Sequence, residues 1–313
     1  MFALCWLAAV AAGAPYLVWQ AEIAAADRLA AQSQFTAAED VSRRALALAE
    51  GLGRPALAAV SENNLGSHYH EWERYGDAEK HYRRALALWA TVPAAPRGRL
   101  RTLNNLASLY LATGQPARAA QLLPSPEDST AATPEAAALL SNLAACEYAR
   151  HHYREARAHY ARSLAMVERL GLPVEAAIAR LNLALVAFAA GRRAAAEAEA
   201  LASLEFLQAN LGEAHPLTGQ AHLSVAMVLE PNPMQAEPHL RAALAIAERT
   251  LGPESPAAAR ALTAYAEMLK RAKRKSEAKT MERRAAEIRR QFDRYGLTRH
   301  TVDWAELTAR ARK

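Results

Sequence analysis

The strongest constraint on the fold is an internal repeat of about 40 residues. A leucine followed by a small residue recurs along the chain, and most copies continue with further small or aromatic residues. The anchor residues are Leu65, Leu106, Leu143, Leu183, Leu223 and finally Tyr265, separated by 41, 37, 40, 40 and 42 residues. A fixed period of this length predicts a stack of similar units, because each unit buries its apolar face only against its neighbours.

Two adjacent copies show the repeat most completely. Residues 63–69 read Asn-Asn-Leu-Gly-Ser-His-Tyr and are followed by Tyr75, Ala78 and Tyr82, whereas residues 104–110 read Asn-Asn-Leu-Ala-Ser-Leu-Tyr. The pattern resembles the tetratricopeptide repeat family, and steps longer than its basic unit of about 34 residues resemble the kinesin-light-chain type. The resemblance implies an all-α, right-handed α-solenoid of about seven helix-turn-helix (TPR) repeats.

Composition agrees with a helical array. Alanine and leucine dominate the 313 residues, only 13 residues are glycine, and aromatic residues make up 6%. Residues that favour strands are therefore sparse. We expect an apolar N-terminal segment over residues 1–20, a TPR solenoid over residues 21–290 and a C-terminal capping tail over residues 291–313, where Asp303 and Glu306 would form a capping box.

The first twenty residues admit three interpretations. Residues 2–20 carry no charge, and about 20 apolar residues suffice to span a bilayer. A cleaved secretory signal would end near residues 12–14, although no basic residue precedes it. An uncleaved anchor would use the whole run, which Gly13 and Pro15 interrupt; the third interpretation is a capping helix for the first repeat. We favour membrane association through this segment, and an exported or membrane-anchored location over a cytoplasmic one.

The side chains around each anchor fit close helix packing. Small residues permit the two helices of a repeat to approach, and they are Gly66, Ala107, Ala144, Ala184 and Ser224. Bulky residues should fill the space between neighbouring units, and they are Tyr82, Leu123, Tyr160 and Leu240. Two proline-containing segments break the pattern: residues 124–130 should end a helix early in an exposed loop, and residues 230–233 should replace a turn between helices.

An asparagine precedes the anchor leucine in four consecutive copies, as Asn64, Asn105, Asn142 and Asn182. In the family that the chain resembles, these positions face the concave groove of the solenoid. Because asparagine both donates and accepts hydrogen bonds, a ladder of them would hold the backbone of an extended peptide without reading its sequence. The alternative is that they bond within the helix pairs and hold no ligand. We favour the ladder, because asparagine is a poor helix former and four aligned copies need a reason.

Further residues on the same helix faces extend the candidate peptide-binding groove. They are Asn63, Asn104, Ser67, Ser108, Arg101, His70 and Tyr148. Farther along the chain the corresponding residues are apolar, namely Leu181, Leu185, Phe188, Val225 and Val228. These would give an apolar stretch of groove or pack in the core, and we slightly favour the core.

No constellation of residues predicts catalysis, a cofactor or a metal. The sequence lacks the His-Glu-x-x-His, Gly-x-Ser-x-Gly and phosphate-binding glycine motifs. Histidines at 68 and 70 point about 200° apart on a helix, and those at 151, 152 and 159 give only a weak indication of a surface metal site. Two cysteines, Cys5 and Cys146, exclude a disulfide framework. We expect no enzyme activity, no cofactor and no metal.

Charge is mixed along the chain. The 38 basic and 32 acidic residues leave a net charge of +6, a modest excess, so we expect no nucleic-acid partner. Basic residues concentrate over residues 270–294 with acidic residues between them, which favours a solvated capping surface over a contact for acidic partners. We therefore expect a scaffold that binds an extended peptide or partner protein in its concave groove. The alternative is a regulatory or sensor module that acts on a separate effector protein.

Overall fold

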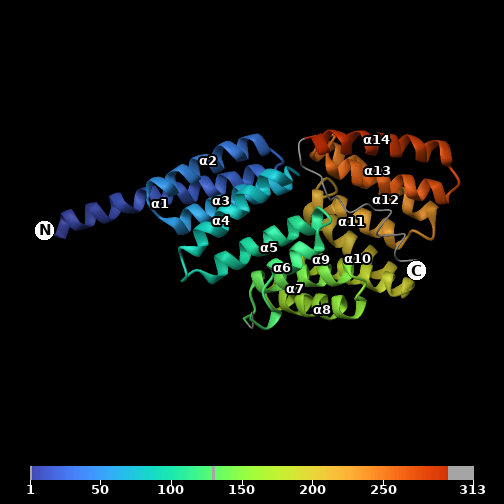
Figure 1. Cartoon of the computed structure of the whole chain (residues 1–313), viewed down its shortest axis with the longest axis horizontal. Coiled ribbons are helices and arrows are strands. Elements are labelled where there is room, and N and C mark those ends of the chain that lie inside the picture. Colours follow the sequence, from blue (N-terminus) through green and yellow to red (C-terminus); the bar gives the residue numbers. More distant parts are fainter. Residues whose placement is uncertain (1, 129–130, 295–313) are drawn as a thin grey trace. The chain divides into compact units, whose positions relative to one another are not determined.

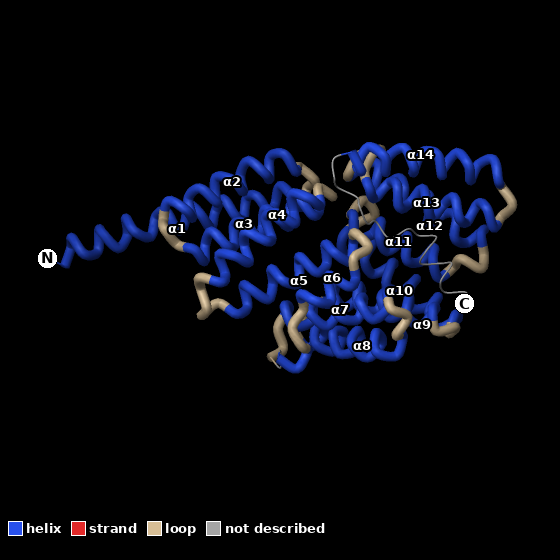
Figure 2. Tube along the Cα trace, in the orientation of Figure 1, coloured by secondary structure: helices blue, strands red, loops and turns tan. Residues whose placement is uncertain are grey.

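The computed structural model describes residues 2–128 and 131–294, and these residues are helical apart from short connections (Figures 1 and 2). They form fourteen α-helices, one 3-10 helix (η1) and no strand. The bounds are α1 Phe2–Ala31, α2 Phe35–Gly51, α3 Pro55–Glu71, α4 Tyr75–Ala90, α5 Pro96–Ala112, α6 Pro116–Leu122, η1 Pro126–Asp128, α7 Pro134–Ala149, α8 Tyr153–Arg169, α9 Pro173–Ala189, α10 Arg193–Leu211, α11 Pro216–Val228, α12 Pro233–Thr250, α13 Pro256–Arg271 and α14 Lys275–Arg294.

The chain divides into two compact units, unit 1 over Met1–Leu109 and unit 2 over Tyr110–Lys313. Within each unit, the two helices of a hairpin pack together, and the second helix also packs on the first helix of the next hairpin. We call the first helix of each hairpin its A helix (odd-numbered) and the second its B helix (even-numbered). The predicted fold class, an all-α solenoid of about seven helix-turn-helix repeats, is confirmed.

One backbone motif closes six of the seven hairpin turns. Each contains one residue in the left-handed region, with φ between 58° and 81°, and these residues are Ser33, Glu73, Gly114, His151, Gly191 and Lys273. The next residue donates its backbone N–H to the carbonyl five positions earlier, as Arg74 does to Tyr69 at 2.8 Å. This is the Schellman arrangement, which satisfies the last carbonyls of the A helix and reverses the chain.

The remaining turn, between α11 and α12, contains proline instead. α11 ends at Val228 and α12 begins at Pro233, so the proline-containing segment replaces the usual turn, as predicted. The other predicted break is also confirmed: α6 ends at Leu122, and a loop containing η1 follows. The expected capping box at Asp303 and Glu306 lies outside the described residues.

The core follows the predicted alternation of small and bulky side chains. Each of the four bulky residues, Tyr82, Leu123, Tyr160 and Leu240, is buried, as are Gly66, Ala107, Ala144 and Ala184. Ser224 differs, since it is only half-buried and its hydroxyl donates to the Gln220 carbonyl of its own helix at 3.2 Å. The neighbouring Val225 is fully buried in its place.

Gly66 marks a close helix approach in unit 1. A Cβ atom added there would lie 2.6 Å from Cδ1 and Cε1 of Tyr82. The Tyr82 ring is buried and its hydroxyl donates to Ser67 Oγ at 3.3 Å, so the ring has little room to move. A side chain at this position therefore forces the two helices of the α3/α4 hairpin apart.

We expect Gly66→Ala to lower the free energy of unfolding by about 2 kcal/mol, because overpacking outweighs the helix propensity gained. Gly51→Ala is the matched control, since a Cβ at Gly51 in α2 would meet nothing within 4 Å. Urea denaturation followed by circular dichroism measures both changes. Equal stability of the two variants would contradict the proposed clash.

The N-terminal helix α1 is continuous through Gly13 and Pro15, so the expectation that these residues interrupt the segment is wrong. Its second half packs as the first A helix. Trp19 is buried, stacks on Tyr16 with ring centres 5.7 Å apart and donates from Nε1 to Ser61 Oγ of α3 at 2.9 Å. Among the described helices, none combines the length and apolarity that a membrane crossing requires.

Candidate functional site

In unit 1, the predicted asparagines join neighbouring A helices to one another. Asn105 of α5 donates from Nδ2 to Asn63 Oδ1 of α3 at 3.1 Å and to Ser67 Oγ at 3.3 Å. Asn63 is buried and donates to Asn64 Oδ1 at 3.4 Å. The Asn105 amide nitrogen therefore joins α5 to α3, whereas the Asn63 amide nitrogen bonds within α3. The carboxamide oxygen of Asn105 accepts no hydrogen bond among the described residues.

In unit 2, Asn142 of α7 and Asn182 of α9 occupy the same register, one residue before the anchor. Both side chains are half-buried. Within the described part of the chain, no hydrogen bond uses the Asn182 side chain, so its donors and acceptor are available to a ligand or to water. Because consecutive A helices of unit 2 carry the two residues, they can form neighbouring rungs for an extended peptide.

The remaining candidates lie in several environments. Asn104 is buried, Ser108 is half-buried and Arg101 is exposed. His70 of α3 meets the Tyr75 ring edge-on, with centres 5.8 Å apart, and half-buried Tyr148 of α7 lies 5.6 Å from the Tyr153 ring. Burial raises the pKa of Tyr148 to about 12, so its hydroxyl stays a protonated donor at neutral pH.

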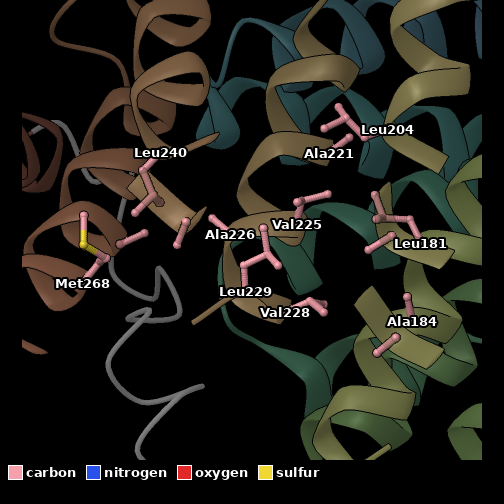
Figure 3. Close-up of a cluster of buried hydrophobic side chains, with 14 of the residues drawn as sticks. Leu181, Ala184, Leu204, Ala221, Val225, Ala226, Val228, Leu229, Leu240 and Met268 are labelled. Atoms are coloured by element: carbon pink, nitrogen blue, oxygen red, sulfur yellow. The ribbon is translucent and has the colours of Figure 1, made fainter. Parts of the chain in front are cut away.

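The apolar candidates belong mainly to the core of unit 2 (Figure 3). Leu181, Val225 and Val228 are buried in one cluster, and Leu185 and Phe188 pack against it while partly exposed. The core interpretation is therefore confirmed for the first three residues, and an apolar stretch of groove has no support from them. Cys146 is likewise buried, as predicted.

The histidines form separate contacts rather than a metal site. His151 lies 2.8 Å from the Tyr153 hydroxyl, whereas His152 lies 2.7 Å from Glu147 Oε2. Burial lowers the pKa of His159, whose Nδ1 is buried without a hydrogen-bond partner in the described residues. No cluster of three or more potential ligands occurs in the described part of the chain.

One hydrogen-bonded chain of residues in unit 1 resembles a catalytic triad in composition. His68 Nδ1 lies 3.0 Å from Ser42 Oγ, and His68 Nε2 lies 3.1 Å from Asp27 Oδ1. Ser42 has no exposed surface, however, so its hydroxyl is closed to any substrate. The three residues come from α2, α3 and α1, and their hydrogen bonds join these helices.

Sequence reasoning missed a polar cluster that occurs once in each unit. In unit 1, Arg43 donates to Glu39 and to the Tyr69 hydroxyl at 3.0 Å, and Arg74 donates to the other oxygen of Glu39 at 3.4 Å. Burial raises the pKa of Tyr69 to about 12. Burial of Glu39 acts to raise its pKa, but hydrogen bonds from Tyr69 and Arg43 outweigh this and lower it.

Unit 2 repeats this cluster on α12, α13 and the following turn. Arg241 and Tyr265 both donate to Glu237 Oε1, at 2.6 and 2.7 Å, and Arg274 donates to Oε2 at 2.7 Å. Each cluster joins a B helix to the next A helix around one tyrosine hydroxyl. The spacing of glutamate and arginine four residues apart on the B helix was the available signal.

The basic C-terminal region is largely paired where the structure describes it. Lys270 contacts Glu267 at 2.9 Å and also contacts Glu282, while Arg284 contacts Glu248 at 2.6 Å. These contacts fit the predicted capping surface, since carboxylates of α12, α13 and α14 compensate part of the positive charge.

The seven helix hairpins and their shared register define an α-solenoid repeat protein. A family model described as tetratricopeptide repeat matches residues 57–123 and 232–291. The two matched segments are tetratricopeptide repeats, as the repeat pattern predicted.

Solved structures with a similar fold share little sequence with the chain. A Rap protein complexed with Competence and Sporulation Factor is 15% identical, with 89% of this chain and 76% of that chain covered and a TM-score of 0.69. The apo form of the quorum sensor NprR from B. thuringiensis is 14% identical, with 88% and 77% covered and a TM-score of 0.59.

A putative kinesin light chain from Podosopora anserina is 20% identical, with 63% of this chain and 97% of that chain covered and a TM-score of 0.46. No curated protein matches the sequence.

Proposed function

We propose that this chain is a non-enzymatic scaffold that captures an extended peptide on the A helices of its repeats. The observation that carries the proposal is the repeated asparagine register, with Asn182 free of intramolecular hydrogen bonds among the described residues. A half-buried carboxamide is costly to leave unpaired, so a peptide amide that pairs with it gains a partially desolvated hydrogen bond. A structure of the same fold supports a peptide ligand, since the Rap conjugation gene regulator of the plasmid pLS20 is described in complex with the Phr* peptide.

The two units contribute differently in this proposal. In unit 1, the Asn105 amide nitrogen bonds to α3, so the Asn105 oxygen serves as an acceptor for a peptide N–H. In unit 2, Asn182 retains both functions of the carboxamide. The proposal therefore assigns the stronger backbone recognition to α9.

We expect Asn142→Ala combined with Asn182→Ala to weaken peptide binding about 10- to 100-fold, because each lost hydrogen bond contributes about 0.5–1.5 kcal/mol. The probe is a fluorescent peptide selected from a random library on the full-length wild-type chain, and anisotropy measures its affinity. Circular dichroism checks that helicity is unchanged.

Asn210→Ala is the matched control. Asn210 is exposed on the B helix α10, and its Nδ2 donates to the Phe206 carbonyl of its own helix. This variant should bind as the wild type does. Wild-type affinity in the double variant, or failure to select any peptide, would overturn the proposed function.

A second candidate is a regulatory module whose bound peptide alters its action on an effector protein. It is favoured by the fold shared with a structure described as a quorum sensor. Capture of an effector from a native extract that the selected peptide displaces would support regulation, whereas simultaneous binding of both would support a simple scaffold. Membrane association through residues 2–20 and the lack of a nucleic-acid partner remain predictions.

A further inference from the structure

The hairpins α9/α10 and α11/α12 of unit 2 each contain a polar contact between their two helices. Arg180 of α9 approaches Glu199 of α10 at 3.8 Å, and His222 of α11 lies 2.9 Å from His239 of α12. Each contact joins an A helix to its own B helix. The two contacts therefore mark equivalent positions in neighbouring repeats.

Counting from these contacts aligns α9 with α11. Asn182 and Ser224 each stand two residues beyond the A-helix residue of the contact. Burial agrees with this alignment, because a half-buried residue stands between two buried residues at 184–186 in α9 and at 226–228 in α11. Ser224 is thus the counterpart of Asn182 in the next repeat.

The half-buried residues of these triplets, Leu185 and Met227, are both apolar. Each follows the polar residue of its repeat by three positions, so its side chain lies on the same helix face. Three positions further along α9, the ring of Phe188 is also half-buried. Because α9 and α11 pack directly against each other within unit 2, these side chains form an apolar surface beside Asn182.

The charge of this surface limits the ligands that fit it. Between Asn182 and Ala189, α9 has no acidic residue, lysine or arginine, and α11 has none over its whole length. On the next A helix, α13, Glu267 and Lys270 pair with each other at 2.9 Å. A charged ligand side chain would lose water here without gaining a partner, whereas an apolar one gains burial. Charge complementarity therefore selects an uncharged, apolar ligand segment.

We propose that Leu185, Phe188 and Met227 form an apolar subsite that takes one side chain of the bound peptide, next to the backbone contact at Asn182. In an extended chain successive side chains point to opposite sides, so one of them enters the subsite while the adjoining backbone pairs with the asparagine. This inference rests on the proposed function and specifies its ligand. The peptide carries a residue such as leucine, methionine or phenylalanine at this point.

The test uses the full-length chain and the fluorescent peptide selected on it. An alanine scan of the peptide should identify one apolar residue whose replacement weakens binding about tenfold. Leu185→Ala and Met227→Ala should each weaken binding of the unchanged peptide about tenfold, the effect of losing about 55 Å² of buried apolar surface.

A cycle of the two changes shows whether the side chains meet. The alanine-substituted peptide should lose less than about threefold further affinity on Leu185→Ala, because the contact is already absent. A loss of protein stability would affect both peptides equally, so the difference reports the contact itself. Independent losses that simply multiply would overturn the subsite.

Exposed residues of the same types provide matched controls. Leu201 lies on the B helix α10 and Met234 lies in the first turn of α12, and both side chains are exposed. Leu201→Ala and Met234→Ala should bind the peptide as the wild type does.

Two further outcomes would overturn the subsite, namely wild-type binding by both groove variants and the absence of a sensitive apolar residue in the peptide. Sensitivity to Asn142 and Asn182 in the same assay would then leave the proposed function intact. Absence of peptide binding by the wild type would overturn both.

Discussion

Glu62→Leu should lower the free energy of unfolding by about 3–5 kcal/mol, the largest effect of a single substitution that we expect in unit 1. Glu62 of α3 and His81 of α4 are both buried, and Glu62 Oε2 lies 2.5 Å from His81 Nδ1. Arg84 approaches the other carboxylate oxygen at 3.8 Å. Removing the glutamate leaves a buried polar ring without its partner, and removing the histidine leaves a buried carboxylate.

The double variant Glu62→Leu with His81→Leu separates the interaction energy of the pair from the cost of burying one unpaired polar group. Two apolar residues of similar volume remove both polar groups, so we expect the double variant to unfold within about 1 kcal/mol of the wild type. Urea denaturation of the wild type, both single variants and the double variant gives the coupling energy. Additive effects would show that the pair contributes no specific interaction.

An exposed pair on α7 and its following turn provides the control. His152 lies 2.7 Å from Glu147 Oε2, and the His152 side chain is well exposed. We expect His152→Leu to change the free energy of unfolding by less than about 1 kcal/mol, as is typical of surface pairs.

The fold was predictable because the repeat anchors carry most of the packing information. Leu65, Gly66 and Tyr82 recur as types along the chain, and their spacing predicts which helix faces meet. The turns between the helices were harder to predict from the sequence. Four of the six left-handed residues are not glycine, among them Glu73 and His151. Their backbone is set by the Schellman hydrogen bonds and by the helices on either side, so the residue type alone gives little signal.

The N-terminal helix shows a second limit of sequence reasoning. Pro15 normally breaks a helix interior, yet α1 runs through it. Trp19 is buried against the first repeats, and its hydrogen bond to Ser61 joins positions 42 residues apart. Hydrophobicity indicates that such a segment must be shielded from water. It does not indicate whether lipid or the chain's own helices shield it.

The candidate site was predictable in register and less so in its hydrogen bonds. The position before each anchor leucine indicated Asn142 and Asn182, and these remain the basis of the proposed ladder. The hydrogen bond between Asn63 and Asn105 could not be predicted, because it joins two repeats through side chains whose orientation depends on helix packing. The contact between His222 and His239 was missed as well, because it joins α11 to α12 through side chains whose approach depends on helix packing.

Acidification provides the second large effect, through the contact between His222 of α11 and His239 of α12, whose Nδ1 atoms lie 2.9 Å apart. We expect the wild type to lose about 3 kcal/mol more stability than His222→Asn between pH 7 and pH 4, since each pKa unit corresponds to about 1.4 kcal/mol. Histidine has an ordinary pKa of 6.5, and the His222 pKa in the folded chain is about 4. Between these two pKa values the unfolded chain binds a proton at His222 and the folded chain does not. The contribution of the neutral histidine to the free energy of unfolding is therefore fully present above pH 6.5 and is lost as the pH falls toward 4.

The physical cause is the arrangement of the two rings. Burial makes the site unfavourable for the first charge, and protonating both rings would place two N–H groups head-on at the 2.9 Å contact. Asparagine at 222 does not titrate, so it removes this contribution while the carboxylates, which also lose stabilising contacts in acid, stay the same in both proteins. Urea denaturation at pH 7, 5.5 and 4 measures the difference. Parallel pH profiles for the wild type and His222→Asn would contradict the buried, neutral pair, whereas a profile that diverges below pH 6.5 would place the histidine contact between α11 and α12 in the folded chain.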